Sequence, residues 1–468
     1  MPLPSEVLER RFPFAPTNGQ RGFMGLLDEL LNDEKPGPQI LLLRGYAGTG
    51  KTTLVSQLVN VLPLFNRKYS LLAPTGRAAK VMSGYAKRSA FTIHKVIYKQ
   101  TSEPGSQNLK FSRQKNYQKD TIFIVDEASM LSNESDFGQN GLLADLMEYV
   151  FEKETNRLIL VGDVAQLPPV GQIESPAMSS AYLRSQFHVD VKEVELTEVL
   201  RQEKASGILE NATALRELIK AENYTPRFIT RPFKDIFRMT SEKLEEGLRY
   251  AYDKFGQENT IIICRSNKSA VMYNQYIRRQ IHFMEDEINA GDILLATRNN
   301  YFYFPEDAPG GFLANGDFVE IMKIISFQEA YGFRFADLEL RMIDYDAGKF
   351  EAKVLLESLH APTPSIGPED HKKLYEEVLK DYEDLANKKE RAEALKKDPF
   401  LNALQVKFAY ALTCHKSQGG QWQAVFVDQG YVKDDMINQD FVRWLYTAVT
   451  RATDEVFLVN FDAKFFGG

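Results

Sequence analysis

The stretch Gly45-Tyr46-Ala47-Gly48-Thr49-Gly50-Lys51-Thr52 organises this chain, and it fits the pattern G-x-x-x-x-G-K-[ST] at every fixed position. Its glycines let the backbone curl so that successive N–H groups point inward at phosphate oxygens. In this pattern the Lys51 ammonium reaches the β- and γ-phosphates, and the Thr52 hydroxyl ligates Mg²⁺. The stretch therefore predicts a site for ATP and Mg²⁺, with these nucleotide-binding residues: Gly45, Gly48, Thr49, Gly50, Lys51, Thr52 and Thr53.

The segments on either side supply the context that this pattern requires. Residues 39–44, Gln-Ile-Leu-Leu-Leu-Arg, are typical of a buried parallel strand. Residues 53–62 have apolar side chains at helical spacing, so a helix N-terminus is expected to face the phosphates. The alternative is a glycine-rich turn without a ligand, which the adjoining strand and helix disfavour.

Composition limits the classes of protein to be considered. A length of 468 residues predicts two to four domains, and a net charge of −7 gives no global attraction to nucleic acid, although a local basic channel stays possible. Cys264 and Cys414 are too few for a disulfide framework, which favours a reducing cytoplasmic compartment. No run of about 18 apolar residues occurs, so we expect no membrane span.

Several polar residues near the first helices are candidates for ligand contacts. Gln20 precedes the phosphate loop by 25 residues, and its amide suits an adenine edge, although a surface position is the alternative. Thr75 begins a predicted helix that carries Arg77 and Lys80. Its hydroxyl can contact a nucleic-acid phosphate or simply cap the helix. His94 adds a further polar group beside a lysine.

Residues 98–119 differ in character from the flanking segments. A Pro-Gly pair at 104–105 lies between aromatic and basic residues. The pattern predicts a small β-hairpin inserted between core strands, and a disordered surface loop is an equal alternative.

Acidic and amide side chains follow the next predicted core strands. Asp126 and Glu127 end the strand that begins at Thr121, and carboxyl ends of parallel strands face the ligand crevice. Asp126 is expected in the Mg²⁺ shell and Glu127 as the base for the attacking water. Gln166, after the strand at 157–162, is expected to sense the γ-phosphate. Arg201 lies at the end of an apolar stretch, and its alternative to a functional role is that of an ordinary salt-bridge partner.

A second αβ pattern begins near Thr260 and contains a long insertion. Residues 286–360 are turn-rich and strand-like, which predicts a small all-β barrel, and the charge-dense run 367–400 predicts a solvated helical hairpin. The αβ pattern resumes at Val406, followed by a polar loop from Thr413 to Trp422 and a helix that presents Arg451.

The chain resembles superfamily 1 DNA helicases, in the RecD-like and Dda-like branch, through its phosphate loop and four further motifs in order: Val125-Asp-Glu-Ala128, Gly162-Asp-Val-Ala-Gln-Leu-Pro-Pro-Val170, His415-Lys-Ser-Gln-Gly419 and Tyr446-Thr-Ala-Val-Thr-Arg-Ala452. The resemblance implies an α/β fold with two RecA-like domains. It places the first at 1–200, with a hairpin insertion at about 95–119. It places the second at 201–285 and 405–468, interrupted at 286–404 by an SH3-like barrel with a helical elaboration.

The resemblance also implies residue roles. Gln20 is similar to the adenine-reading residue, Gln166 to the γ-phosphate sensor, and Arg201 and Arg451 to arginine fingers. Strand-contacting positions are implied at Thr75, His94, Thr413, His415 and Ser417. The family usually has Glu where this chain has Gln421, which loses a charge near the nucleotide.

The expected function is therefore ATP-driven translocation on single-stranded and forked DNA by a monomer. An RNA-directed helicase and a nucleotide-gated binding module that does not unwind are the alternatives. The expected direction, 5′→3′, rests on branch resemblance, because the first domain carries only the short hairpin. In that interpretation Tyr98 and Phe111 lie near the hairpin turn and form a wedge that splits the duplex.

Overall fold

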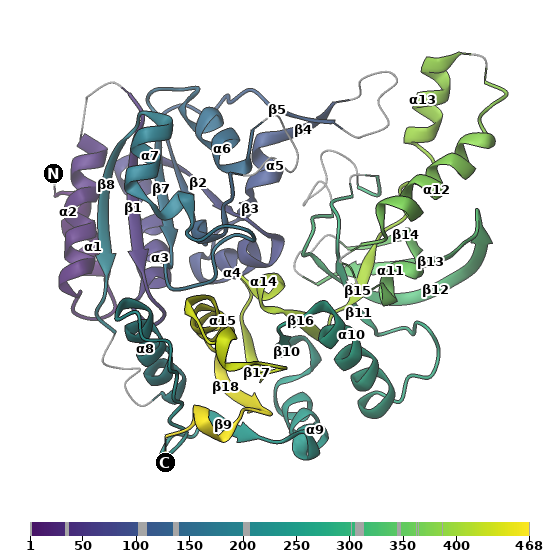
Figure 1. The fold of residues 1–468 in the computed structure, drawn as a ribbon. Helices are drawn as coiled ribbons and strands as arrows, with labels where there is room; N and C mark the ends of the chain where they lie inside the picture. The colour runs from purple at the N-terminus through teal and green to yellow at the C-terminus, as the bar shows by residue number, and fades with distance from the viewer. Residues whose placement is uncertain are drawn as a thin grey trace.

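The computed structural model describes residues 2–32, 37–101, 110–133, 140–199, 206–300, 302–304, 313–343, 348–361, 363, 365–385 and 387–467. Three sheets and one hairpin make up the described fold (Figure 1). Single 3₁₀ or π turns connect the main elements at Leu62–Phe65, Ala128–Met130, Pro176–Met178, Ser241–Lys243, Gln257–Asn259, Ile277–Ile281, Asp434–Met436 and Ala463–Phe465. Within these residues no helix is long and apolar enough to cross a membrane.

The first sheet is parallel, in the order β3-β2-β6-β7-β1-β8. Its strands are β1 (Gln39–Gly45), β2 (Lys68–Ala73), β3 (Ala90–Thr92), β6 (Thr121–Val125), β7 (Arg157–Gly162) and β8 (Asp190–Leu196). Strand β1 is apolar on both faces because both are covered. Leu41 and Leu43 belong to one core cluster and Ile40 and Leu42 to another.

Helices of the first unit divide between these two core clusters. Residues of α1 (Pro4–Arg11), α2 (Asn18–Asn32), α3 (Lys51–Val61) and α4 (Gly76–Ala86) contribute to the cluster that holds Leu41. Residues of α5 (Ile93–Ile97), α6 (Leu142–Phe151) and α7 (Ser180–Phe187) contribute to the opposite cluster. The layered arrangement brings the carboxyl ends of β1, β6 and β7 to one edge of the sheet.

The predicted hairpin is confirmed as two antiparallel strands, β4 (Tyr98–Thr101) and β5 (Lys110–Arg113), paired from Tyr98↔Arg113 to Thr101↔Lys110. Tyr98 lies at the base of this hairpin and not near its turn. Its hydroxyl donates a 2.6 Å hydrogen bond to Asp145 Oδ2 of α6, because the register places it next to the domain core. Its expected position near the turn is therefore wrong, and Tyr98 is not proposed as part of the wedge. The turn, 102–109, and the side chain of Phe111 lie outside the described residues.

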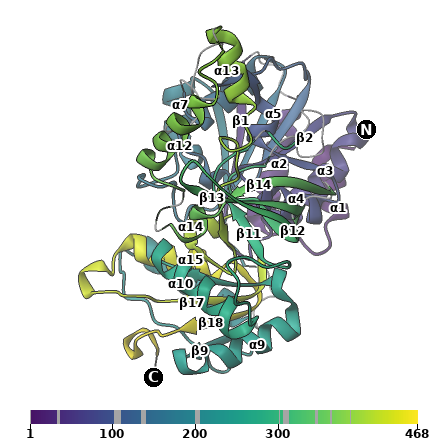
Figure 2. The same ribbon diagram turned by 90° about the vertical axis from the view of Figure 1, so that its right-hand side faces the viewer.

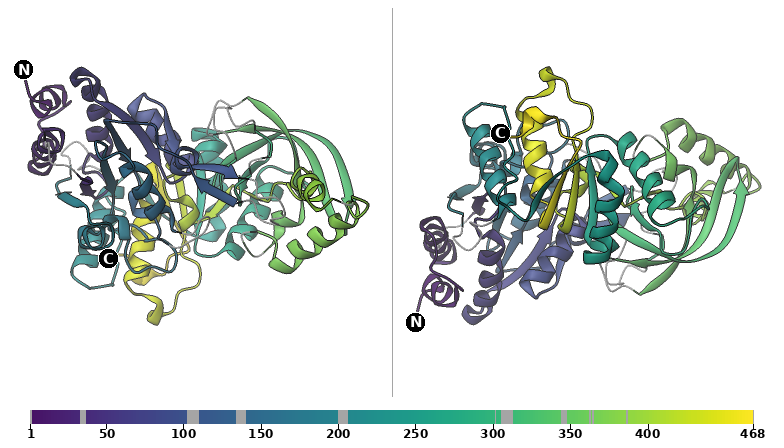
Figure 3. Two further views of the ribbon diagram at one scale, coloured as in Figure 1. Left: turned by 90° about the horizontal axis from the view of Figure 1, so that it is seen from above. Right: turned by 90° about the horizontal axis from the view of Figure 1, so that it is seen from below.

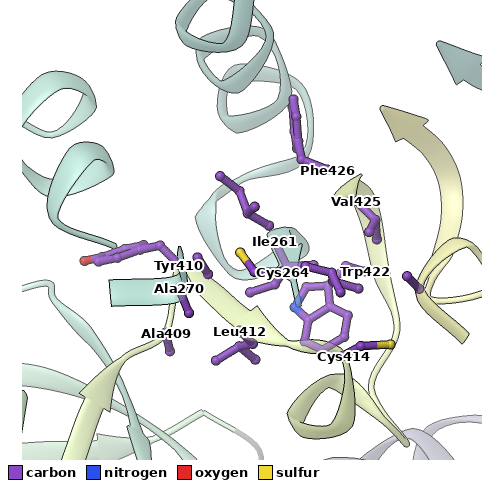
Figure 4. Packing of buried hydrophobic residues seen from close by; sticks show 14 of the residues in the cluster. Ile261, Cys264, Ala270, Ala409, Tyr410, Leu412, Cys414, Trp422, Val425 and Phe426 are labelled. Carbon is purple, nitrogen blue, oxygen red and sulfur yellow. The ribbon is translucent and has the colours of Figure 1, made fainter. Parts of the chain in front are cut away.

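A second parallel sheet has the order β16-β10-β17-β18-β9. Its strands are β9 (Ile236–Met239), β10 (Thr260–Cys264), β16 (Ala411–Thr413), β17 (Trp422–Asp428) and β18 (Ala452–Val459), accompanied by α8 (Gly207–Lys220), α9 (Leu244–Phe255), α10 (Asn267–Tyr276), α14 (Cys414–Ser417) and α15 (Gln439–Val449). Cys264 and Cys414 are free and buried in its core, near Trp422 and Leu412 (Figure 4).

The third sheet is antiparallel, in the order β14-β13-β12-β11-β15. It comprises β11 (Ile293–Ala296), β12 (Phe318–Ala330), β13 (Phe333–Met342), β14 (Lys349–Leu355) and β15 (Val406–Phe408), with α11 (Glu357–His360) beside it. A bridge between Val354 and Leu404 links the end of β14 to the segment that leads into β15, which curls the sheet toward a barrel. This module and its helices lie at the end of the molecule opposite the N-terminus (Figure 3).

The helical run after the barrel forms α12 (Pro368–Lys380) and α13 (Lys388–Lys396). The sequence predicted a solvated helical hairpin here, and this prediction is wrong for the face of the helices that packs on the barrel. Leu374, Val378 and Leu395 pack with Phe333 and Phe335 of β13 in a separate apolar cluster. The two helices therefore extend the barrel and share a core with it.

One contact joins all three sheets, and a second holds the root of the barrel. Arg77 of α4 lies between the rings of Phe318 and Trp422, 5.2 and 5.1 Å from their centroids, so it links all three sheets. Within the second unit, buried Arg278 binds Asp292 at 2.8 Å at the root of the barrel.

Figure 2 shows the first sheet above, the second below and the barrel facing the viewer. The predicted α/β fold class is thereby confirmed.

Candidate nucleotide-binding cleft and strand-contacting surface

A cleft of about 730 Å³ lies where the first and second parallel sheets meet. The first unit supplies the phosphate loop, Tyr85, Asp126, Glu127, Asp163 and Gln166. The second supplies residues of α8, Gly419, Gln421, Thr450 and Arg451. Neither unit encloses this space alone, so the site is composite.

The phosphate loop has the curled backbone that its glycines predict. Gly48 and Gly50 have φ of 73° and 83°, the left-handed region that glycine tolerates without strain. A Cβ on Gly45 would lie 2.9 Å from the Lys51 side chain. Helix α3 begins at Lys51, so its N-terminus faces the cleft. Lys51 Nζ donates to the carbonyls of Gly45 and Tyr46 at 2.7 and 2.9 Å.

Gln20 is fully buried in α2, which excludes the surface position considered from the sequence. Its Nε2 donates to the Thr49 carbonyl at 3.0 Å, and its Oε1 accepts from the Thr17 backbone N–H at 2.9 Å. The Thr49 hydroxyl in turn donates to the Tyr46 carbonyl at 2.7 Å. Gln20 thus stabilises the phosphate loop by linking Thr49 to the start of α2.

The two acidic residues after β6 occupy different surroundings. Asp126 Oδ2 accepts a 2.5 Å hydrogen bond from the Tyr85 hydroxyl, while its Oδ1 accepts from the Glu127 backbone N–H at 2.9 Å. Glu127 has a φ of 53°, rare for a residue with a side chain, which aims it into the cleft. Burial raises the pKa of Glu127, and nearby Asp126 raises it further, against the lowering effect of Arg451 and Lys51.

Gln166 and Arg451 face Glu127 from opposite units. Gln166 is 6% exposed and hydrogen-bonds to Glu127. Arg451 is 3% exposed, and its Nη1 lies 3.9 Å from Glu127 Oε1 across the cleft. The structure thus brings a base, an amide and a cation together around one point. Arg201, the other expected arginine finger, lies outside the described residues.

The residues present fit a magnesium ion that arrives with a nucleotide. Thr52 is exposed at the first turn of α3, and Asp126 lines the same cleft. Among the described residues, no three His, Cys, Asp or Glu side chains converge into a cage for a metal. Mg²⁺ takes few protein ligands in phosphate-loop enzymes and keeps water and phosphate oxygens.

Two buried residues that we did not predict as site residues connect the units. Tyr446 of α15 donates to Asp163 Oδ2 at 2.6 Å and accepts from the Ala47 backbone N–H of the phosphate loop at 2.8 Å. Asp163 Oδ2 also lies 3.9 Å from Lys51 Nζ. An acid directly after β7 was a usable signal, as for Asp126. Tyr446 begins one of the quoted sequence motifs, but nothing in that motif identified Asp163 or the phosphate loop as its partners.

Two of the expected strand-contacting residues belong to the first unit. Thr75 Oγ1 accepts from the Ala78 backbone N–H at 3.2 Å, so it caps α4. A Cβ on Gly419 would lie 3.3 Å from Thr75 Oγ1, which places this cap against the loop after α14. The His94 ring lies 5.6 Å from the Tyr98 ring, and burial lowers its pKa to about 4. His94 is therefore a neutral imidazole at pH 7.

The other three lie around α14 of the second unit and differ in access. His415 is exposed and Thr413 is half-buried. Thr413 shares a small pocket with Thr297 and Lys416. Ser417 is fully buried, and its hydroxyl donates to the Cys414 carbonyl at 2.8 Å. Because its side chain is buried, Ser417 is not placed to contact a nucleic-acid strand directly.

Comparisons with known proteins agree with the order of these elements. Residues 29–224 match the AAA domain family and residues 408–459 the UvrD-like helicase C-terminal domain. The ATP-dependent DNA helicase dda of Enterobacteria phage T4 is 29% identical over 43% of this chain and 42% of its own length. In its motifs and their order, this chain is similar to the superfamily 1 helicases of the 5′→3′ branch.

Other relatives of this chain match over different shares of their length. An uncharacterized protein of Acanthamoeba polyphaga mimivirus is 25% identical over 89% of this chain and 94% of its own length. The ATP-dependent RecD2 DNA helicase of Deinococcus radiodurans is 28% identical over 39% of this chain and only 22% of its own. A structure of Pif1 helicase from Bacteroides with ADP-AlF3 and ssDNA covers 97% of this chain and 95% of its own, at 14% identity and a TM-score of 0.46.

Proposed function

We propose that this protein is an ATP-dependent DNA helicase that moves 5′→3′ along single-stranded DNA and unwinds forked duplexes. The observation that carries the proposal is the composite cleft, in which Arg451 of the second unit lies 3.9 Å from Glu127 of the first. A site shared by two units is complete only when they are closed, so hydrolysis and domain motion are coupled.

Each cleft residue has a role that its chemistry supports. Lys51 and the N-terminus of α3 would hold the β- and γ-phosphates. Thr52 and Asp126 would hold Mg²⁺, which would supply positive charge to the β- and γ-phosphate oxygens. Glu127 takes the proton of the attacking water, and its raised pKa makes it a stronger base than an exposed carboxylate. Arg451 stabilises the charge that develops on the γ-phosphate.

Thr75, His94, Thr413 and His415 are proposed to contact a DNA strand. Thr75 and Gly419 approach each other from the two units. A strand bound along them would therefore be gripped by both units in alternation. We further propose that the protein acts as a monomer, because one chain already supplies both walls of the cleft. We propose a cytoplasmic location because the two cysteines are free thiols, which a reducing compartment favours.

The deciding experiment compares ATP turnover without nucleic acid, with single-stranded DNA and with single-stranded RNA. It then measures unwinding of forks with a 5′ or a 3′ tail. We expect stimulation by DNA and unwinding from the 5′ tail. Arg451→Ala serves as the control, binding ATP but hydrolysing it about 10³–10⁵-fold more slowly. Stimulation by RNA alone, unwinding from the 3′ tail alone, or no stimulation would each contradict the proposal.

A further inference from the structure

A second cavity, of about 290 Å³, lies behind the nucleotide cleft. We name it the rear chamber. It is lined by the end of β1, the loop after β7, the start of α7 and the side chain of Arg443 from α15. Asp163 and Gln166 line both the rear chamber and the nucleotide cleft, so these two residues form the partition between the spaces.

The walls of the rear chamber hold polar atoms without protein partners. Among the described residues, Ser129 Oγ, Gln166 Oε1, Ser175 Oγ and Arg443 Nε make no hydrogen bond. Ser129, Gln166 and Arg443 are 2, 6 and 7% exposed. Buried polar atoms are almost always satisfied, so unpaired donors and acceptors around a cavity indicate water or a polar ligand inside it.

Charge and size narrow the chemistry of that ligand. Arg44 and Arg443 bring two guanidinium groups to the walls, with Arg44 paired to Glu193 at 2.6 Å. Arg443 uses Nη1 on the Ile173 carbonyl at 2.5 Å, which leaves Nε free to donate. Glu174 and Asp163 are the acids of the chamber, and the Tyr446 hydroxyl donates to Asp163. At about 30 Å³ per water, the volume holds on the order of ten waters or one hydrated small anion.

We propose that the rear chamber receives the orthophosphate released by hydrolysis and conducts it out between the two units. The inference rests on the proposed ATP hydrolysis, in which water attacks the γ-phosphorus, the bond to ADP breaks, and Glu127 takes the proton. Gln166 stands at the partition, next to Glu127, so its displacement opens the chamber from the side of the cleaved bond. The unpaired Arg443 Nε then donates to a phosphate oxygen, a charge-assisted hydrogen bond.

This route has a functional advantage over release through the front of the cleft. ADP, held by Lys51 and the phosphate loop, would leave on that side after the phosphate. Separate exits allow the phosphate to leave while the units are still closed on ADP. The α15 helix carries both Arg443 and Tyr446, so departure of the anion is transmitted directly to the second unit.

The test separates bond cleavage from phosphate release on single-stranded DNA. Quenched-flow measures cleavage, and a fluorescent phosphate-binding protein measures release. Ser175→Leu fills the chamber. Arg443→Met removes the guanidinium whose Nε has no hydrogen-bond partner. We expect cleavage near the parent rate in both variants and release slowed about tenfold, with Arg443→Lys in between. Arg265→Met is the matched control, because Arg265 stacks on Phe441 and Trp444 of α15 and does not line the chamber. In this control, release should keep pace with cleavage.

A binding measurement tests the chamber independently of turnover. Inorganic phosphate is titrated by calorimetry into the ADP-loaded protein. We expect measurable heat of phosphate binding with the parent and with Arg265→Met. We expect a phosphate affinity at least tenfold weaker with Arg443→Met and with Ser175→Leu. Equal phosphate affinity in all four proteins, or release in step with cleavage in both chamber variants, would overturn the proposal. A parent that binds phosphate in this way but does not hydrolyse ATP would instead overturn the proposed function alone.

Discussion

Glu127 combines a strained backbone, a buried carboxylate and a cation from the other unit. Burial raises its pKa above the ordinary carboxyl value of about 4.3. Because the base must be ionised, turnover should fall as the pH drops through this raised pKa. Arg451 lowers the same pKa, so Arg451→Ala should move the acid limb of the rate profile to higher pH. Glu127→Gln should bind ATP and scarcely hydrolyse it. A profile unchanged in Arg451→Ala would contradict the pairing.

Tyr446 should couple the phosphate loop to Asp163. Tyr446→Phe keeps the ring but leaves the Ala47 N–H and Asp163 Oδ2 without this partner, at a cost of about 1–3 kcal/mol. We expect slower DNA-stimulated turnover with little change in single-strand affinity. Asp163→Asn and the double variant complete a mutant cycle, in which the effects should be markedly non-additive. Additive losses would show that the hydroxyl and carboxylate act separately.

Where a local pattern carries the chemistry, the sequence predicted which residues lie together, and their roles stay predictions. Lys51, Thr52 and Asp126 follow directly from a loop and a strand end, and the structure brings them to one cleft. The Tyr446 contact joins residues 399 positions apart, so no local pattern reports it. The burial of Gln20 could not be predicted from the sequence either, because it depends on how α2 packs behind the phosphate loop.

At the scale of elements, apolar periodicity was sufficient for the core strands, whereas turn chemistry left the hairpin and a disordered loop as equal alternatives until the pairing of β4 with β5 decided between them. Both faces of β1 are covered, so its central residues 40–43 form a continuous apolar run. The packing of α12 and α13 was harder to predict, because Leu374 and Val378 form a narrow apolar stripe on a helix otherwise rich in charge. The stripe is explained by its packing on Phe333 and Phe335 of β13, a contact that forms only in the assembled barrel.

The hairpin β4–β5 is proposed to separate the strands of the duplex. Replacing residues 100–110 by a Gly-Ser turn removes its outer part and keeps Tyr98 anchored to Asp145. We expect unwinding to be lost while ATP turnover stimulated by single-stranded DNA is retained. A variant with Tyr98→Phe alone should unwind normally, since that residue lies at the hairpin base. Full unwinding by the trimmed protein would rule out the wedge.

The root of the barrel depends on a buried ion pair. Asp292 is fully buried and binds Arg278, and it also accepts from the Tyr410 hydroxyl at 2.9 Å. Asp292→Ala leaves a guanidinium charge buried without its partner, which costs about 3–5 kcal/mol. Urea denaturation followed by circular dichroism should show a clear loss of stability. Glu376→Ala, which breaks an exposed pair with Lys372, should change stability by less than about 1 kcal/mol.

At the scale of the whole molecule, net charge constrains how DNA is held. A net charge of −7 argues against a broad basic face that would release many counterions from DNA. Affinity for single-stranded DNA should therefore come from a few phosphate contacts and from base stacking. Measured against salt concentration, the affinity should have a shallow slope that corresponds to few displaced ions. A slope near −10, like that of a large repressor, would contradict this view.

The position of Arg77 between two aromatic rings has a practical consequence. The chain has two tryptophans, and one of them, Trp422, packs against this first-unit guanidinium, 5.1 Å from its ring centroid. A cation over an indole ring changes its emission, and separation of the units would withdraw that cation. The unlabelled protein therefore carries its own optical reporter of opening and closing. Trp444→Phe would leave Trp422 as the single emitter, so nucleotide-driven cycling becomes visible in a stopped-flow fluorimeter.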